Sequence, residues 1–148
     1  MTMTRGSILQ VTAELPNLAV VRCFVEEMAT GLEFDCKVID DMLQAVEEAV
    51  ANTILHGYSR QPGAIEVEVQ RERDELVVRL RDQAPHFDPT GFPPPDLTLP
   101  LEERRPGGLG IHLMRQFTDT VIYRVTSDER NELTLVKRQI ATWEKGDK

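Results

Sequence analysis

The 148-residue chain is long enough for one domain and too short for two of ordinary size. Hydrophobic residues make up 41% of it and charged residues 28%, a balance typical of a globular domain and unlike that of a disordered chain. With 17 basic and 25 acidic residues the net charge is -8, which argues against a general nucleic-acid binder and against a protein that binds anionic membranes.

The cysteine content and the hydropathy indicate the compartment in which the protein is expected and whether it spans a membrane. Cys23 and Cys36 are too few for a disulfide framework or a four-thiolate zinc site, and we expect both to be small buried hydrophobic residues. No run of about 18 apolar residues is present, and the first residues lack a signal-peptide pattern. The default expectation is a reduced, cytoplasmic protein without a membrane span.

The first third of the chain predicts a strand and two helices. Alternating apolar residues predict a short strand over residues 8–13. Helical spacing then predicts a helix that Asn17 caps and that ends near Gly31. A second and longer helix is predicted from a cap at Asp35 to Gly57.

The remaining elements are two pairs of strands with a loop and a short helix between them. Residues 65–69 and 76–80 alternate with a period of two, and the chain must turn near residues 73–74. A helix over residues 111–117 is followed by the last two strands, at 121–125 and 133–135. Because runs of strands are separated from runs of helices, we predict an α+β fold in which a mixed or antiparallel sheet carries helices on one face.

Prolines interrupt this pattern in one long segment. Seven of the nine prolines fall between Pro85 and Pro106, which excludes a long helix or a central strand there. A loop longer than about 15 residues in a small domain is commonly a lid or a disordered segment. We expect a lid over residues 87–106 within a single domain of residues 1–148, and a surface excursion without a role is the alternative.

The second predicted helix carries a polar pair, Glu48 and Asn52. At about 100° per residue both fall opposite the apolar stripe that contains Ile39, and their i, i+4 spacing makes them neighbours. An ordinary solvated face explains such a pair on spacing alone. Small or apolar residues surround it, however, and favour the floor of a cleft: Ala45, Ala49, Ala51 and Leu55.

A carboxylate stands at the end of a predicted strand. Asp82 begins the segment Asp-Gln-Ala-Pro-His-Phe-Asp-Pro, directly after the strand of residues 76–80. In that position a carboxylate can accept a hydrogen bond from a ligand amine, although an aspartate that only initiates a turn is also common.

Glycines lead into the helix of residues 111–117. Unpaired N–H groups at a helix start favour phosphate, and glycine lets a ligand approach the backbone closely, while a plain helix cap is the alternative. The segment Gly107-Gly108-Leu109-Gly110 lacks the Gly-Lys-Ser/Thr of a Walker loop and the glycine spacing of a dinucleotide fingerprint.

The three motifs, taken in chain order, resemble those of the GHKL superfamily of ATP-binding domains, which have the Bergerat fold. Within it, the likeness is to the small anti-sigma-factor serine/threonine kinases. Residues 47–58, Glu-Glu-Ala-Val-Ala-Asn-Thr-Ile-Leu-His-Gly-Tyr, are similar to the N box of that family. Residues 82–89 resemble its first glycine box and residues 106–111 its second, and the likeness covers about residues 8–138.

The resemblance implies that the chain binds ATP and Mg²⁺. It implies that Glu48 is the general base that takes a proton from the attacking hydroxyl. It further implies that the Asn52 side chain binds Mg²⁺ and that Asp82 accepts a hydrogen bond from the adenine amino group. The fold it implies is a two-layer sandwich with a lid over the nucleotide.

The second glycine box and the lid complete the implied nucleotide site. Gly108, Leu109 and Gly110 would hold the phosphates beneath the lid of residues 87–106. The lid arginine of many relatives is displaced in this sequence, and Arg105 is the candidate for a contact with the γ-phosphate.

Two further positions matter to the adenine end of the site. Ala84 stands where many relatives have glycine, which changes how closely the backbone can approach adenine. Thr134, on the last predicted strand, is a candidate for an additional adenine contact.

The implied function is an anti-sigma regulatory factor with serine/threonine kinase activity. Its partners would be an anti-anti-sigma (STAS-type) protein, which it phosphorylates, and a sigma factor, and a homodimer is left open. The alternatives are a module that binds ATP or ADP without efficient transfer, and an ATPase. The presence of Glu48 favours the kinase, because a pure binder needs no base.

Overall fold

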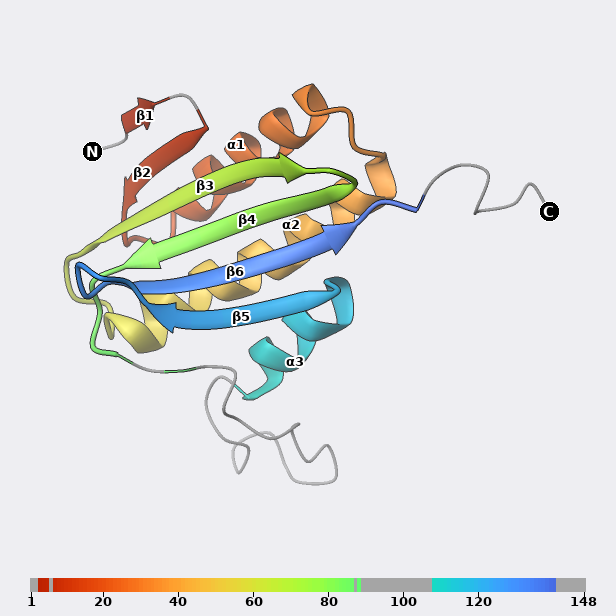
Figure 1. Ribbon diagram of the computed structural model, residues 1–148. Coiled ribbons are helices and arrows are strands. Elements are labelled where there is room, and N and C mark those ends of the chain that lie inside the picture. Colours follow the sequence, from red (N-terminus) through yellow and green to blue (C-terminus); the bar gives the residue numbers. More distant parts are fainter. Residues whose placement is uncertain (1–2, 6, 87, 89–107, 141–148) are drawn as a thin grey trace.

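The computed structural model describes residues 3–5, 7–86, 88 and 108–140, which form two layers (Figure 1). One layer is a six-stranded sheet, and three helices cover one of its faces. The helices are α1 (Asn17–Gly31), α2 (Cys36–Asn52) and α3 (Gly108–Phe117). The α+β class and the two-layer arrangement are therefore confirmed. Apart from Asp88, the predicted lid lies outside the described part of the chain, as do the residues after 140.

The sheet has the strand order β1-β2-β3-β4-β6-β5, and every neighbouring pair is antiparallel. The short first strand had no signal in the sequence, whereas the other five were predicted. A turn at Arg73 and Asp74 joins β3 to β4, as expected, with Arg73 in the left-handed region at φ 60. The strands are β1 (Met3–Arg5), β2 (Ile8–Thr12), β3 (Ala64–Glu72), β4 (Glu75–Asp82), β5 (Thr120–Val125) and β6 (Asn131–Arg138).

The core lies between the sheet and the helices. Because side chains alternate along a strand, Val67 on β3 and Leu80 on β4 face the helices and are buried. Met42, Val46 and Ala49 of α2 pack into the same core. Each such fully buried side chain contributes about 1.5–3 kcal/mol relative to its exposed state. This burial fixes which face of each strand looks toward α2.

Two expectations about local positions were wrong. The first α-helical residue is Asn17 itself, and its side chain does not cap the helix; its Nδ2 donates to the carbonyl and the Oγ1 of Thr12, both at 2.9 Å. Cys23 and Cys36 are exposed, because Cys23 lies away from the buried stripe of α1 and Cys36 is the first residue of α2. None of the helices in the described ranges is long and apolar enough to cross a membrane.

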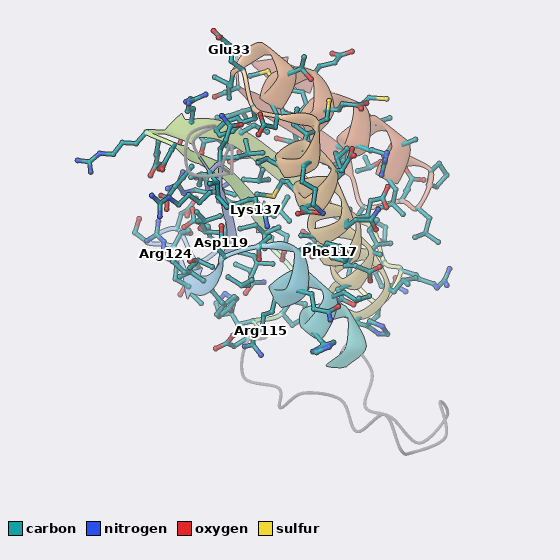
Figure 2. All side chains as sticks on the ribbon, turned by 90° about the vertical axis from the view of Figure 1, so that its right-hand side faces the viewer. Glu33, Arg115, Phe117, Asp119, Arg124 and Lys137 are labelled. Carbon is teal, nitrogen blue, oxygen red and sulfur yellow. The ribbon has the colours of Figure 1, made fainter. Side chains whose placement is uncertain are left out.

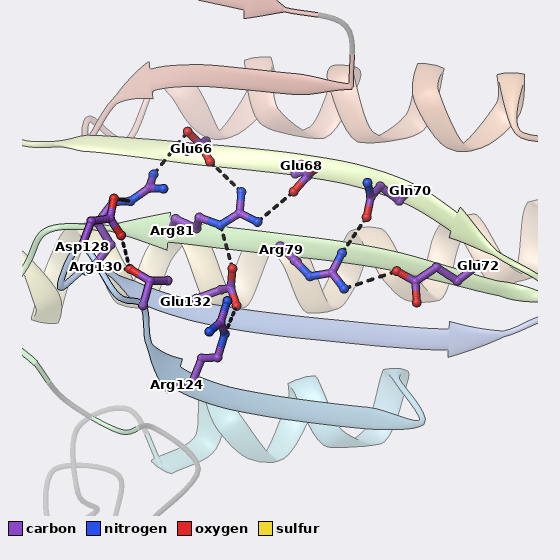
Figure 3. Close-up of polar contacts among 11 residues, drawn as sticks. Glu66, Glu68, Gln70, Glu72, Arg79, Arg81, Arg124, Asp128, Arg130 and Glu132 are labelled. Carbon is purple, nitrogen blue, oxygen red and sulfur yellow. Dashed lines mark hydrogen bonds and ion pairs between the residues drawn. The ribbon is translucent and has the colours of Figure 1, made fainter.

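The outer face of the sheet carries paired charges (Figure 3). Arg81 on β4 donates to Glu66, Glu68 and Glu132 at 2.6, 2.8 and 2.7 Å. Arg124 on β5 donates to the other oxygen of Glu132 at 2.5 Å, and the Glu132 side chain is only 3% exposed. The Glu132 carboxylate therefore links the three strands β4, β6 and β5 across this face.

The ionisation of Glu132 reflects this enclosure. Burial alone would raise the pKa of its carboxyl, but the hydrogen bonds from Arg124 and Arg81 and their charges outweigh it, so the pKa lies below its ordinary value. A carboxyl whose pKa is lowered on folding stabilises the fold above its unfolded pKa. That contribution is lost as the pH falls through the folded pKa.

Replacement of Glu132 tests this account. We expect Glu132→Gln to lower the free energy of unfolding by about 2 kcal/mol at pH 7, because it removes charge-assisted hydrogen bonds to two arginines. The difference from the wild type should shrink as the pH falls below the ordinary glutamate pKa of 4.5. Urea denaturation at pH 7 and pH 3.5 measures both. Glu72→Gln is the control, since its side chain is 51% exposed and, within the described ranges, forms an ion pair with Arg79 and no other residue. An equal loss of stability in both variants would contradict the proposed role of Glu132.

Candidate functional site

The helix that carries the polar pair ends in an irregular turn. The α-helix α2 stops at Asn52, and η1 (Thr53–Gly57) continues it as a π-helical turn. The Tyr58 N–H closes this turn on the Thr53 carbonyl at 2.8 Å. The predicted span to Gly57 is thus confirmed, but its last turn is wider than an α-helix. Single π-helical turns occur frequently at functional sites.

Glu48 and Asn52 are half-buried on α2. Ala45 and Ala49, on the same side of the helix, are 0% and 2% exposed. α3 packs against α2 (Figure 2). The pair therefore does not lie on an ordinary solvated face. Within the described part of the chain, neither side chain has a hydrogen-bond or ion-pair partner.

The pKa of Glu48 is raised above its ordinary value, first by burial and then by the negative charge of Glu47. Glu47 itself is paired with Arg22 of α1. Two adjacent glutamates thus have different environments: Glu47 pairs with an arginine, and the Glu48 carboxylate has no partner among the residues that the structure describes. A carboxyl with a raised pKa and no structural partner is a candidate for proton transfer.

Asp82 is the last residue of β4, and one of its carboxylate oxygens is fully used. Oδ1 accepts hydrogen bonds from the Ala84 N–H and from Asn131 Nδ2, both at 2.9 Å. Burial raises the pKa of Asp82 in spite of these two bonds. No other residue of the described ranges donates to Oδ2, so this oxygen is left for a ligand or water.

Asn131, the first residue of β6, was missed by the sequence analysis. It is directly opposite Asp82 in the sheet, is 7% exposed and accepts a hydrogen bond from the Tyr123 hydroxyl at 2.5 Å. The predicted adenine contact of Thr134 is wrong, because Thr134 pairs with Arg79 and thus lies on the outer face of the sheet. Alternation alone puts Thr134 on the outer face, because its neighbours Leu133 and Leu135 face the core. Only the register between β4 and β6 shows that Asn131 lies opposite Asp82, and periodicity does not supply the register.

Direct contacts join the end of α2 to the segment after β4. The Tyr58 hydroxyl accepts a hydrogen bond from the Gln83 N–H and donates one to the Ala64 carbonyl, both at 2.8 Å. A Cβ at Gly57 would lie 3.4 Å from the Cβ of Ala84. Motifs about 30 residues apart in the sequence are therefore neighbours in space.

The third motif begins α3. Gly108, Leu109 and Gly110 form the first turn of this helix, and do not precede it as the sequence suggested. The first four N–H groups of an α-helix have no partner within the helix, so this turn can offer donors. α3 runs antiparallel to α2, which it contacts, and begins toward the end of the molecule where α2 ends (Figure 1). Arg105 lies outside the described residues.

Comparison with known proteins decides the family. Residues 11–137 match the family described as "Histidine kinase-like ATPase domain". The chain belongs to this family. The resemblance to the GHKL superfamily, and within it to the anti-sigma kinases, is thereby confirmed.

Several members are related to this chain over most of their length. The serine/threonine-protein kinase BtrW of Bordetella bronchiseptica is 29% identical over 128 residues, which cover 86% of this chain and 88% of that protein. The serine-protein kinase RsbW of Listeria monocytogenes is 30% identical over 125 residues, covering 81% and 80%. RsbW of Bacillus cereus is 25% identical over 133 residues, covering 87% and 82%.

Removal of the Tyr58 hydroxyl tests whether it links the end of α2 to the segment that follows β4. We expect Tyr58→Phe to lower the free energy of unfolding by about 1 kcal/mol, because the Gln83 N–H and the Ala64 carbonyl lose their shared partner. The Gln83 amide hydrogen should exchange faster with solvent, which NMR measures. Ser59→Ala is the control, since its hydroxyl makes only a long contact of 3.4 Å with the His56 carbonyl. Unchanged exchange at Gln83 would contradict the link.

Proposed function

We propose that the chain is an ATP-dependent protein kinase that transfers the γ-phosphoryl group to a serine or threonine hydroxyl of a partner protein. The observation that carries the proposal is the half-buried Glu48 carboxylate, which has a raised pKa and no partner in the described residues, on the same helix face as Asn52. Relatives named serine-protein kinases that match most of the chain support it.

Asp82 is proposed to bind adenine. Its Oδ1 is already engaged by Ala84 and Asn131, so Oδ2 is the oxygen that would accept from the adenine amino group. A half-buried acceptor oxygen with no partner in the described part of the chain favours a ligand that presents an N–H group there. Guanine presents a carbonyl at the corresponding position, and it would repel the carboxylate.

The phosphate end is assigned to Asn52 and the start of α3. The Asn52 side chain has no partner among the described residues and would supply one oxygen ligand to Mg²⁺, with nucleotide phosphates providing others. When bound, Mg²⁺ would neutralise charge on the phosphates. The N–H groups of Gly108, Leu109 and Gly110 are proposed to face the phosphates, with Arg105 as a further contact.

Glu48 is proposed as the general base. Phosphoryl transfer has a loose transition state, so positioning and electrostatic stabilisation account for most of the catalysis. The base must be ionised and within hydrogen-bond reach of the acceptor hydroxyl. Burial and the charge of Glu47 raise the Glu48 pKa, which makes its carboxylate a better proton acceptor.

The proposed partners are an anti-anti-sigma (STAS-type) protein as phosphate acceptor and a sigma factor as a bound target, with a homodimer as the proposed assembly. We place the protein in the cytoplasm, where two exposed free cysteines stay reduced.

Transfer of radiolabelled γ-phosphate to candidate STAS proteins tests the function. We expect Glu48→Gln to reduce transfer by at least about a hundredfold while the affinity for Mg-ATP, measured by calorimetry, changes little. Glu47→Gln is the matched control and should keep phosphoryl transfer. Because this substitution removes a negative charge that raises the pKa of Glu48, the acidic limb of the pH–rate profile should move to lower pH. If Glu48→Gln transfers phosphate at the wild-type rate, Glu48 is not the general base. If the wild type binds nucleotide but transfers no phosphate, the protein is a binding module and not a kinase.

A further inference from the structure

We propose that Asn131, held in turn by Tyr123, is a positioning residue for nucleotide recognition: it fixes Oδ1 of Asp82 and so leaves Oδ2 directed at the base. This inference rests on the proposed function, because it assumes that Asp82 meets the base.

The hydrogen bonds determine the orientation of the Asn131 amide. Nδ2 donates to two acceptors, Asp82 Oδ1 and the Ala84 carbonyl, each at 2.9 Å. Oδ1 accepts the hydroxyl hydrogen of Tyr123 at 2.5 Å. A flipped amide would place its oxygen against two acceptors and its NH₂ against the hydroxyl, so one orientation satisfies the group. The two acceptors thus determine which atom Asn131 presents to Asp82, and the Tyr123 hydroxyl holds the amide oxygen in that orientation.

The sheet holds this arrangement from both sides. Asn131 pairs with Asp82 on β4 and with Val125 on β5, in the middle of three adjacent strands. The next residue, Glu132, points to the outer face and is fixed by Arg81 and Arg124 (Figure 3). The relative positions of β4 and β6 at Asp82 are therefore constrained on both faces of the sheet.

Asn131 also acts on the charge of Asp82. Burial raises the pKa of Asp82, and the Asn131 hydrogen bond is the largest opposing influence, followed by the Ala84 N–H and the charge of His86. His86 follows β4, and among the described residues Tyr58, after η1, is a further titratable group that interacts with Asp82. Arg81 and Glu132 lie on the opposite face. Loss of the Asn131 amide therefore raises the pKa of Asp82 further. As the pH is lowered, Asp82 is then protonated sooner, and ATP binding is lost at a higher pH than in the wild type.

The experiment is calorimetric titration of the full chain with ATP and with GTP between pH 5 and pH 8.5. For Asn131→Leu we expect about tenfold weaker ATP binding at pH 8, a smaller preference for ATP over GTP, and an acidic loss of affinity that begins at higher pH. Tyr123→Phe should change the same quantities in the same direction but less. Asn131→Ser, which keeps a donor, should recover part of the preference. Thr134→Val, on the outer face of the same strand, is the control and should behave as the wild type.

Three results would overturn the inference: wild-type affinity in Asn131→Leu, equal loss of ATP and GTP binding, or an unshifted pH dependence. Should Asn131→Leu fail to fold, Tyr123→Phe carries the same test. Should the wild type bind no ATP, the proposed function fails, yet the Asn131 contact can still be tested. NMR titration of the Asp82 carboxyl in the free protein must then show a higher pKa in Tyr123→Phe than in the wild type, and an unchanged pKa would overturn the contact as well.

Discussion

The register between β4 and β6 is the constraint on which the candidate site depends. It places Asp82 opposite Asn131 on the face of the sheet that carries the helices. Side chains alternate along a strand, so a slip of one residue would turn Asp82 to the outer face and bring Arg81 to the inner one. Two independent sets of interactions prevent such a slip. Leu80 and its neighbours are buried against the helices, and the Glu132 carboxylate holds the arginines of β4 and β5 on the other face.

The acidic groups of the protein fall into two classes that their environments separate. Glu132 is enclosed by two arginines, and its pKa is lowered, as expected of a carboxylate that stabilises the fold. Glu48 and Asp82 are partly buried, and their pKa values are raised; the Glu48 carboxylate and Asp82 Oδ2 have no partner within the described residues. Unpaired carboxylate oxygens in partly buried positions destabilise a fold unless a ligand uses them. Asp82 directly precedes Gln83, whose N–H donates to the Tyr58 hydroxyl, and Glu48 lies on α2, the helix that leads through η1 to Tyr58.

Much of this could be predicted from the sequence, because periodicity reports burial. The alternation of β3 and β4 and the apolar stripe of α2 gave the two-layer fold, and the spacing of Glu48 and Asn52 placed them together. Periodicity does not report which strands pair or in what register, so Asn131 was missed. The choice of Thr134 neglected the alternation itself, since Leu133 and Leu135 on either side of it face the core. Capping also depends on tertiary contacts: Asn17 bonds back to Thr12 and leaves the helix start without a side-chain cap. The exposure of Cys23 shows the same limit, since cysteine chemistry alone does not determine which side of α1 faces the core.

The central claim is that the three motifs bind one nucleotide on the helical side of the sheet, with its base at Asp82. A crystal structure of the protein with Mg²⁺ and a non-hydrolysable ATP analogue tests it most directly. We expect the adenine amino group within hydrogen-bond distance of Asp82 Oδ2, the metal ion at the Asn52 side chain, and the γ-phosphate on the side of α2 that carries Glu48. A nucleotide bound on the outer face, or one whose base contacts neither Asp82 nor its immediate neighbours, would contradict it.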